Sequence, residues 1–429
     1  MNVSGTLIGG QPPARGPAGL ILLIFPGLVV CCISLVFVAR YHSEFHIFYD
    51  PARLPVALMV VAAFSLVSYL FVIARFSFGY LVGFYFYAMV LGYLWINCFS
   101  DLEYDHRLSG LSMAASAIAF LLPALFITSP IRPRYTLSAT ALERLLTLIL
   151  VVAAGTIAIG IGYNFRFVSI GKIYDFREDV QFPLLLRYWM GITSNALLPY
   201  AFGCFAMRRE NRRAGITLAL MLLFYPITLS KLALFAPAWL LVILLLSRIL
   251  ETRVTVIVSL LLPVLFGIVL VSVLGRPALP YFDLVNFRMI AVPSSAIDLY
   301  SAFFAKHDLT HFCQIGYLKH LIDCPYQEQL SIVMANTYEL GNINASLFST
   351  EGVASVGILF APVSVFACSL VFGLANRLSA GLPPRFILIS GGILPHILLN
   401  VPLTITLLTH GAAVLFLLWY VTPRTIFEQ

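Results

Sequence analysis

Charged residues are scarce in this chain, and that scarcity excludes most classes of soluble protein. Asp, Glu, Lys and Arg together make up 10% of the 429 residues, whereas soluble domains carry roughly 25%. Hydrophobic residues make up 60%, and the mean hydropathy is +0.95. Polar stretches long enough to form a separate soluble domain are also missing. The composition therefore predicts an all-α polytopic membrane protein.

The motifs of several common enzyme classes are absent as well. The sequence contains no Gly-x-x-x-x-Gly-Lys-Ser/Thr phosphate loop, no His-Glu-x-x-His zinc motif and no Gly-x-Ser-x-Gly nucleophile elbow. We therefore expect no nucleotide site, no metal and no cofactor. A formal net charge of +7 does not indicate nucleic acid as a partner, because the basic residues lie beside apolar runs and not in one continuous patch.

Cysteine is sparse, with seven residues in the chain. Most of them lie in apolar runs, where cysteine behaves as a small hydrophobic residue. Cys313 and Cys324 instead lie in the longest polar stretch. They could form a disulfide in an oxidising compartment or remain two free thiols, and the sequence leaves both alternatives open.

Apolar runs long enough to cross a bilayer, about 20 helical residues each, recur along the whole chain. We interpret the first run as a retained signal anchor, because no convincing cleavage site follows it. Two turns, at 230–231 and near Thr404, are so short that bent or re-entrant helices are an alternative there. We predict twelve membrane spans near 19–38, 54–74, 78–99, 111–128, 145–165, 184–207, 214–229, 232–247, 254–274, 354–374, 386–402 and 405–421.

Arginines concentrate in alternate short loops, which predicts that both termini are cytoplasmic. The predicted organisation is a cytoplasmic tail at 1–18, nine spans within 19–274, a large external loop at 275–353, three spans within 354–421 and a short cytoplasmic tail at 422–429.

The long external loop is expected to contain two short helices. Segment 293–307 starts with Pro293 and a Ser295/Asp298 pair that resembles a capping box. Its apolar residues share one face, which predicts a helix lying in the membrane interface. A second helix is expected within 326–341, with Gly341 as its C-cap and an apolar stripe formed by Leu330, Val333, Met334 and Tyr338.

The candidate site residues are polar groups near the outer ends of the predicted spans. A charge inside an apolar run costs several kcal/mol unless it snorkels, pairs or faces water. For Arg187 we therefore favour a functional role over a snorkelling one. For Lys231, an interfacial anchor and an anion ligand are equal alternatives.

Arg288 and His396 each carry a functional and a structural interpretation. Arg288 precedes segment 293–307, where its guanidinium would either bind a phosphate or pair with Asp283 or Asp298. For His396 we favour a packed, hydrogen-bonded histidine over a ligand-binding one.

Two stretches together resemble a known family. "FRMIAVPSSAIDLYSAFF" at 287–304 and "GNINASLFSTEGVASVG" at 341–357 resemble the signature of bacterial oligosaccharide repeat-unit polymerases, the Wzy-type O-antigen and exopolysaccharide polymerases. The family's acidic position, usually Asp, is Glu351 here. The positions that carry the resemblance are Arg288, Pro293, Tyr300, Asn342, Asn344, Ala345, Phe348, Glu351, Gly352 and Gly357.

The resemblance implies a glycosyltransferase of the bacterial inner membrane that extends glycans on undecaprenyl diphosphate at the periplasmic face. Its chemistry needs cations for the leaving diphosphate and a base near the attacking hydroxyl. It implies Glu351 and Arg288 as catalytic residues, and a chain-length regulator as a possible further partner. The expected substrate-binding residues are Arg187, Lys231, Arg276, Tyr300, Asn342, Asn344 and His396.

Three alternative functions remain from the sequence. One is a structural membrane component without activity, which would leave the charged residues of the outer face unexplained. A ligase that attaches finished O-antigen to the lipopolysaccharide core would share substrate and layout. A flippase or other twelve-span carrier should show two similar halves around a long central loop, yet the central loop is only "RRENRR" at 208–213. Without the family resemblance, the polar stretch 341–357 would be interpreted as a cap between two helices.

Overall fold

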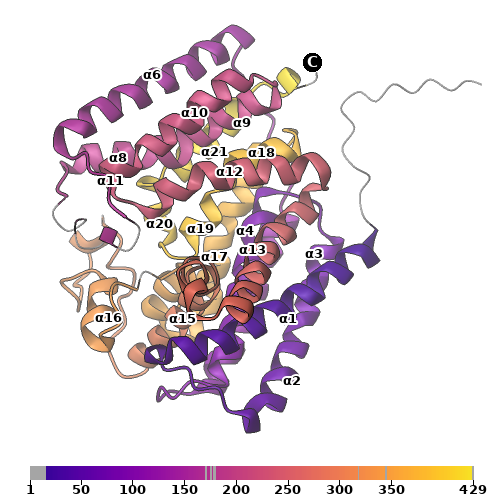
Figure 1. The fold of residues 1–429 in the computed structure, drawn as a ribbon, viewed down its shortest axis with the longest axis vertical. Helices are drawn as coiled ribbons and strands as arrows, with labels where there is room; N and C mark the ends of the chain where they lie inside the picture. The colour runs from indigo at the N-terminus through magenta and orange to yellow at the C-terminus, as the bar shows by residue number, and fades with distance from the viewer. Residues whose placement is uncertain are drawn as a thin grey trace, which may run out of the picture.

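Helices form nearly all of the regular structure (Figure 1). The computed structural model describes residues 16–169, 172–173, 176, 180–316, 318–343 and 345–427. Within these ranges the only β-type pairing is one isolated bridge between Ile47 and Ser100. The expected all-α class is confirmed.

Eight helical segments in the described ranges are long and apolar enough to cross a membrane. A multi-span membrane protein is therefore supported by length and composition. The segments are Ala18–Tyr41 in α1 (Pro17–Tyr41), Pro51–Ile73 across α2 (Leu54–Ser65) and α3 (Tyr69–Ile73), α4 (Phe78–Asn97), α5 (His106–Phe126), α6 (Ala139–Tyr163), α12 (Lys231–Ile249), α13 (Thr252–Leu274) and Phe348–Ser379, which includes α17 (Ser355–Ser379).

The other four predicted spans contain shorter or interrupted helices, so the structure does not establish all twelve. Pro402 precedes the helix that starts at Leu403, and Gly411, with φ of +76°, separates that helix from the one that starts at Ala412. These segments hold α8 (Leu184–Ile192) and α9 (Leu198–Met207) with a π-helical turn between them, α10 (Asn211–Leu223) and α11 (Tyr225–Thr228), α18 (Pro384–Gly391) and α19 (Leu394–Leu398), and α20 (Leu403–Leu408) and α21 (Ala412–Val421).

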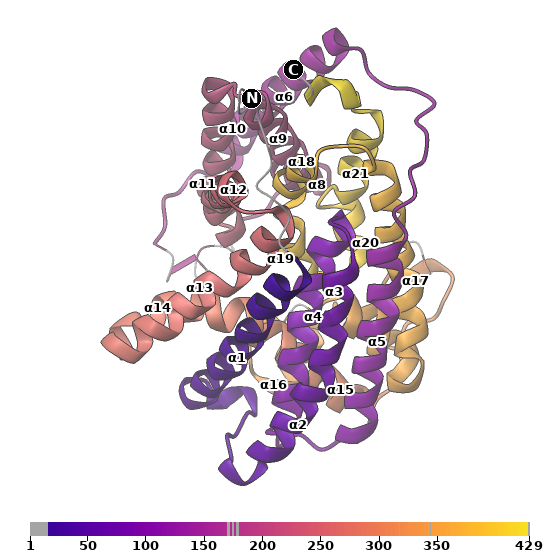
Figure 2. The ribbon, with the colours of Figure 1, turned by 90° about the vertical axis from the view of Figure 1, so that its right-hand side faces the viewer.

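Helix α4 forms the centre of the molecule, since every residue from Phe78 to Ile96 is buried. It contacts α1, α2, α5 and α17, and in Figure 2 it lies among α1, α3 and α5. Gly79 lets α4 approach α5 closely, because an added Cβ would clash with the Ala124 carbonyl. Asn376 of α17 ties all three helices, accepting from Gly79 N and donating to Ala124 O, both at 2.7 Å.

The region 275–353 is folded, but its first helix differs from the prediction. The expected helix within 293–307 is present as α15 (Val292–Phe304), which ends three residues earlier than the predicted segment. It continues from α14 (Leu279–Phe282) through a π-helical stretch, Asp283–Ala291, so Ser295 lies inside a helix and cannot cap one.

The predicted interfacial position of α15 is wrong as well, since all of its residues are buried in the protein. The polar face has partners that the sequence pattern did not show. Asp298 accepts hydrogen bonds from Ser100, at 2.7 Å, and Tyr104. Ser109 donates to Ser301 at 2.9 Å.

The second predicted helix is confirmed as α16 (Leu330–Tyr338). Leu330 and Met334 of the expected apolar stripe are buried. The C-cap is Glu339, in the left-handed region with φ of +58°, and not Gly341. Gly341 also has a positive φ, of +73°, two residues further on.

Candidate functional site

A π-helical turn, Phe348–Ala354, carries Glu351 into the interior of the protein. Such turns are rare and occur frequently at functional sites. Gly357, with φ of +78°, then interrupts the helical geometry before the rest of α17. A residue with a side chain would be strained there. One irregular turn therefore contains the Glu351 carboxylate, and a second, at Gly357, follows it.

The Glu351 side chain is buried but incompletely hydrogen-bonded. The residue is 5% exposed. Its Oε2 lies 2.8 Å from the Thr350 hydroxyl, which lies equally close to the Ser346 carbonyl and can donate its one proton to either. Its Oε1 is 3.5 Å from the Thr404 amide, a long contact. The carboxylate therefore has acceptor capacity left for a ligand.

A cavity of about 150 Å³ opens beside this carboxylate. An apolar cavity of similar volume in another protein holds one six-membered ring. The polar lining consists of hydroxyls and amides plus one carboxylate, with no Lys or Arg among the described lining residues. Lining residues are Tyr300, Phe312, Gln314, Ile315, Gln329, Leu330, Ser331, Ala345, Thr350, Glu351, Ser355, Pro402, Thr404 and Ile405.

Tyr300 is the second predicted site residue at this cavity. Helix α15 positions it, and the residue is 1% exposed. Burial raises the pKa of its phenol, and the nearby Glu351 charge raises it further. The hydroxyl therefore stays protonated at neutral pH, and no hydrogen-bond partner for it is found among the described residues. It is available as a donor to a ligand.

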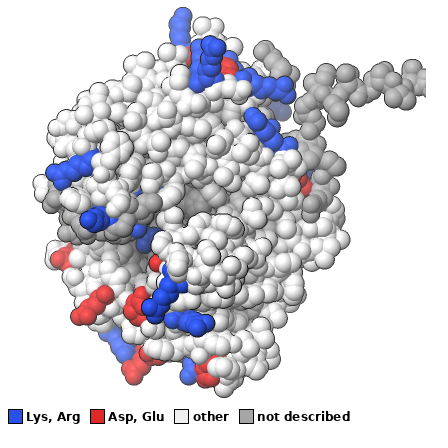
Figure 3. Space-filling view, in the orientation of Figure 1, with Lys and Arg blue, Asp and Glu red and all other residues white. Residues whose placement is uncertain are grey.

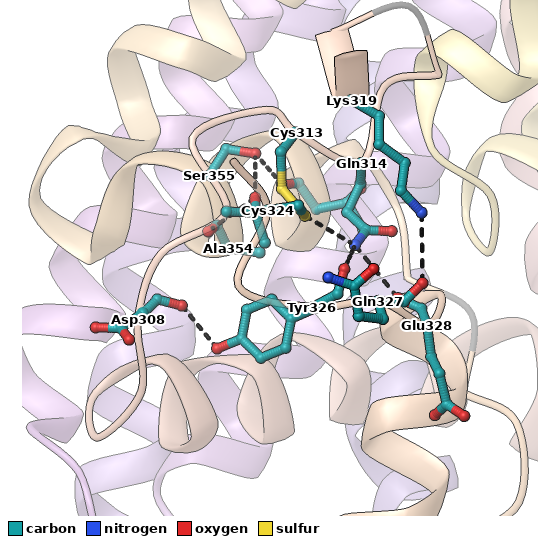
Figure 4. Close-up of a disulfide and its surroundings, with 12 residues drawn as sticks. Asp308, Cys313, Gln314, Lys319, Cys324, Tyr326, Gln327, Glu328, Ala354 and Ser355 are labelled. Atoms are coloured by element: carbon teal, nitrogen blue, oxygen red, sulfur yellow. Dashed lines mark hydrogen bonds between the residues drawn. A yellow bond between two sulfur atoms is a disulfide. The ribbon is translucent and has the colours of Figure 1, made fainter. Parts of the chain in front are cut away.

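A loop that contains a disulfide forms one wall of the cavity; we call residues 308–316 and 318–329 the disulfide-bonded loop. Cys313 and Cys324 are joined, which decides between the two alternatives that the sequence left open (Figure 4). The loop is anchored to the segment after Glu351, because Thr310 N donates to Ala354 O at 2.8 Å and His311 N to Ser355 O at 3.1 Å.

Two hydrogen bonds stabilise the loop internally. Tyr326 donates its hydroxyl proton to the Asp308 carbonyl at 2.7 Å, as Figure 4 shows. The Gln314 amide nitrogen lies 3.3 Å from the Glu328 carbonyl. Phe312, Gln314 and Ile315 are thus held against the cavity.

The predicted cations lie outside this cavity. Arg187, Arg276 and Arg288 are exposed. Arg288 forms no ion pair with any described residue, and its two expected partners are engaged elsewhere. Asp283 accepts from His42 at 2.8 Å, and Asp298 accepts from Ser100 and Tyr104.

The remaining predicted residues also lie elsewhere or cannot be placed. Lys231 begins α12 and is partly buried, and Asn342 is exposed. His396 packs edge-on against Tyr85 and Trp239, with a buried Nε2 that has no hydrogen-bond partner among the described residues. Asn344 lies outside the described residues. Of the predicted residues that the structure describes, only Glu351 and Tyr300 lie together at the cavity.

Sequence reasoning missed the neutral lining groups. Thr350 and Ser355 belong to the same polar stretch as Glu351, so their position beside the carboxylate was the available signal. Thr404 lies in a short turn, for which the sequence suggested a bent or re-entrant helix but no site residue. Gln314 and Gln329 reach the cavity through the path of the disulfide-bonded loop, which no local pattern encodes.

A scan against protein-family models and searches of the curated proteins and of the solved structures find no match to this chain. The functional argument therefore depends on the geometry of the Glu351 cavity and on the residues that line it.

Proposed function

We propose that this protein is a membrane glycosyltransferase that polymerises undecaprenyl-diphosphate-linked oligosaccharide repeat units in O-antigen or exopolysaccharide biosynthesis. The observation that carries the proposal is the buried Glu351 carboxylate beside a ring-sized cavity of hydroxyls and amides. Neutral hydrogen-bonding groups with one carboxylate suit a sugar that must lose a hydroxyl proton. The resemblance of segments 287–304 and 341–357 to repeat-unit polymerases supports the same conclusion.

In this proposal Glu351 acts on the acceptor sugar. The acceptor hydroxyl oxygen attacks the anomeric carbon of the donor glycan, the bond from that carbon to the diphosphate oxygen breaks, and the hydroxyl proton passes to Glu351. Tyr300 and Thr350 orient the acceptor by hydrogen bonds. The donor is already activated, so the reaction needs no nucleotide, metal or cofactor.

The leaving diphosphate requires positive charge. Arg276 and Arg288 are the proposed ligands. Both are exposed on the segment that leads into α15, and neither forms an ion pair with a described residue. In this arrangement the acceptor sugar binds in the cavity beside Glu351, which has no Lys or Arg among its described lining residues. The donor diphosphate binds at the surface, at the depth of the lipid headgroups.

The proposed setting is the bacterial inner membrane, with twelve spans, both termini cytoplasmic and region 275–353 on the periplasmic side. Charge distribution supports this orientation. In Figure 3 the upper end of the molecule, where Figure 1 places the C-terminus, carries mainly basic side chains, whereas acidic and basic ones lie together near the lower end. Basic residues favour the cytoplasmic side. A lipid-linked oligosaccharide is the proposed substrate, and a chain-length regulator the proposed partner.

Deletion of the gene tests the proposal through the pattern of surface glycan. Loss of a polymerase should leave single repeat units attached to the lipopolysaccharide core. Bare core in the deletion strain would indicate a ligase, and a block in export would indicate a flippase. Either of these two patterns would reject the polymerase assignment.

A further inference from the structure

Three arginines lie at the end of the molecule opposite to the one proposed to carry the active site. Arg209 is in the turn between α9 and α10, Arg248 in the last turn of α12, and Arg385 in the first turn of α18. Arg385 donates its Nε–H to Ser247 at 3.0 Å, which fixes α18 beside the end of α12. Helix α9 packs against α18, and a Cβ at Gly203 would contact the Phe386 ring at 3.2 Å.

Neighbouring arginines at this end of the molecule form ion pairs or hydrogen bonds with other groups of the protein. Arg208 and Arg213 pair with Glu143 and Glu210, for example Arg213 with Glu143 at 2.9 Å. Arg424 is surrounded by backbone carbonyls, including that of Tyr420 at 2.8 Å.

Arg209, Arg248 and Arg385, by contrast, form no ion pair with any carboxylate in the described ranges. Burial lowers the pKa of Arg385, and the charges of Arg248 and Arg209 lower it further. Three like charges without a counter-ion favour the binding of an anion.

An exposed apolar stripe continues from these arginines along α12. Leu241, Leu245 and Ile249 follow the helical repeat and are 42%, 48% and 70% exposed. Arg248 lies on the same side of the helix. Guanidinium groups at the end of an apolar stripe match a ligand with a charged head group and a hydrocarbon tail. A soluble anion would make no contact with the stripe.

We propose that Arg209, Arg248 and Arg385 bind the phosphodiester of an anionic membrane lipid, with an acyl chain along the exposed face of α12. Arginine grips phosphate through paired hydrogen bonds from a planar fork, whereas lysine supplies a point charge. The site is separate from the Glu351 cavity and does not depend on the proposed enzymatic activity.

Native mass spectrometry of the purified full-length protein tests the proposal. The probes are phosphatidylglycerol, phosphatidylcholine and the soluble anion sn-glycerol 3-phosphate. We expect preferential retention of phosphatidylglycerol, and we expect Arg248→Gln/Arg385→Gln to weaken it by about tenfold or more. The matched control is Arg132→Gln/Arg134→Gln, which removes the same charge from exposed arginines and should bind like the wild type.

The lysine pair Arg248→Lys/Arg385→Lys keeps the charge that orients the protein, and should bind phosphatidylglycerol with intermediate affinity if the fork matters. It also serves as the readout if the glutamine pair does not fold. The proposal would be overturned if the wild type, the lysine pair and the glutamine pair all retained phosphatidylglycerol equally. So would equal binding of phosphatidylcholine, or equally effective competition by sn-glycerol 3-phosphate.

Discussion

Glu351 is the one charged group among the described residues that line its cavity, and its neighbours leave its hydrogen-bonding capacity partly unused. The Thr350 hydroxyl shares its proton between Glu351 and Ser346, and the Thr404 amide is at 3.5 Å. A fully hydrogen-bonded carboxylate would be a weak base, because such bonds stabilise its charged form. The incomplete shell fits a residue that exchanges a proton with a ligand.

Replacing Glu351 by Gln should separate a general base from a structural cap. The amide keeps the size and one acceptor but cannot take the proton, so we expect chain extension to fall by about 10²–10⁴-fold. Glu351→Asp should retain partial activity. The measurement is product length on gels from purified variants. Glu339→Gln is the matched control, since Glu339 is exposed at the C-cap of α16. Near wild-type extension by Glu351→Gln would remove the catalytic role.

Asp298 is a second buried carboxyl group, but it does not line the cavity. It lies on the opposite face of α15 from Tyr300, where Ser100 and Tyr104 donate to it. Burial raises the pKa of Asp298 from 3.8 to about 6, against the opposing effects of those hydrogen bonds and of His106 and His46. We infer that Asp298 fixes α15, and with it Tyr300, to the loop between α4 and α5.

The raised pKa of Asp298 makes stability depend on pH. The protonated form is favoured in the folded state, so its contribution is complete below pH 3.8 and is lost as pH rises through about 6. The difference corresponds to roughly 3 kcal/mol at most. Thermal unfolding in detergent should therefore show wild-type stability falling between pH 4 and about 6.5, and this slope should be shallower in Asp298→Asn. The exposed Asp308→Asn is the control, and an unchanged slope in Asp298→Asn would contradict the assignment.

At the scale of elements, the disulfide-bonded loop determines the shape of the cavity wall. Cys313 is fully buried, and the loop places Phe312, Gln314 and Ile315 at the cavity. His311 and Phe312 adopt left-handed backbone conformations, with φ of +47° and +67°, although neither is glycine. Such conformations persist only where the surrounding structure enforces them. The covalent link and the bonds from Thr310 and His311 to Ala354 and Ser355 provide that enforcement.

Removal of the disulfide should loosen the wall without unfolding the membrane helices. The two cysteines are 11 positions apart in the sequence, and a cross-link that closes a loop of this size contributes roughly 2–3 kcal/mol. In Cys313→Ser/Cys324→Ser we expect faster proteolysis within 308–329 and a higher KM for the acceptor with a smaller change in kcat. Limited proteolysis with mass spectrometry and acceptor titration measure the two effects. Cys204→Ser, a buried free cysteine, is the control, and equal proteolysis of the two variants would rule out this role for the disulfide.

The sequence predicted helices better than their surroundings. Hydropathy located α4 and α13 equally well, yet α4 is completely buried and α13 is partly exposed. An apolar helix buried in protein and one facing lipid have the same composition, because both environments are apolar. The breaks in 386–402 and 405–421 had visible signals in Gly391, Gly392, Pro402 and Gly411, whose effects depend on packing.

Only two residues of the candidate site could be predicted from the sequence. Glu351 was predicted from its polar surroundings and from the family resemblance, and Tyr300 from the resemblance alone; both line the cavity. The π-helical turns could not be predicted, because they change side-chain register without a sequence signature. Contacts such as Thr404 with Glu351 join residues far apart in the chain, so they depend on the tertiary fold.

The orientation of the whole molecule can be tested by labelling single cysteines. The background should lack the five free cysteines and keep the disulfide. A cysteine at Lys319 should react with an impermeant thiol reagent after outer-membrane permeabilisation, and one at Asn211 should not. Both positions are exposed, so a difference in reactivity reports the side of the membrane. The reverse pattern would invert the orientation and move the Glu351 cavity to the cytoplasmic side.

The most direct test of the central claim is chain extension by the purified protein alone. Wild-type protein in detergent or nanodiscs is mixed with undecaprenyl-diphosphate-linked repeat units, without nucleotide sugar and with EDTA present, and the products are separated by length. The account predicts a ladder of lipid-linked oligomers that is lost in Glu351→Gln and retained in Glu339→Gln. A product mixture that still consists of single repeat units, from protein that is folded and monodisperse, would contradict it.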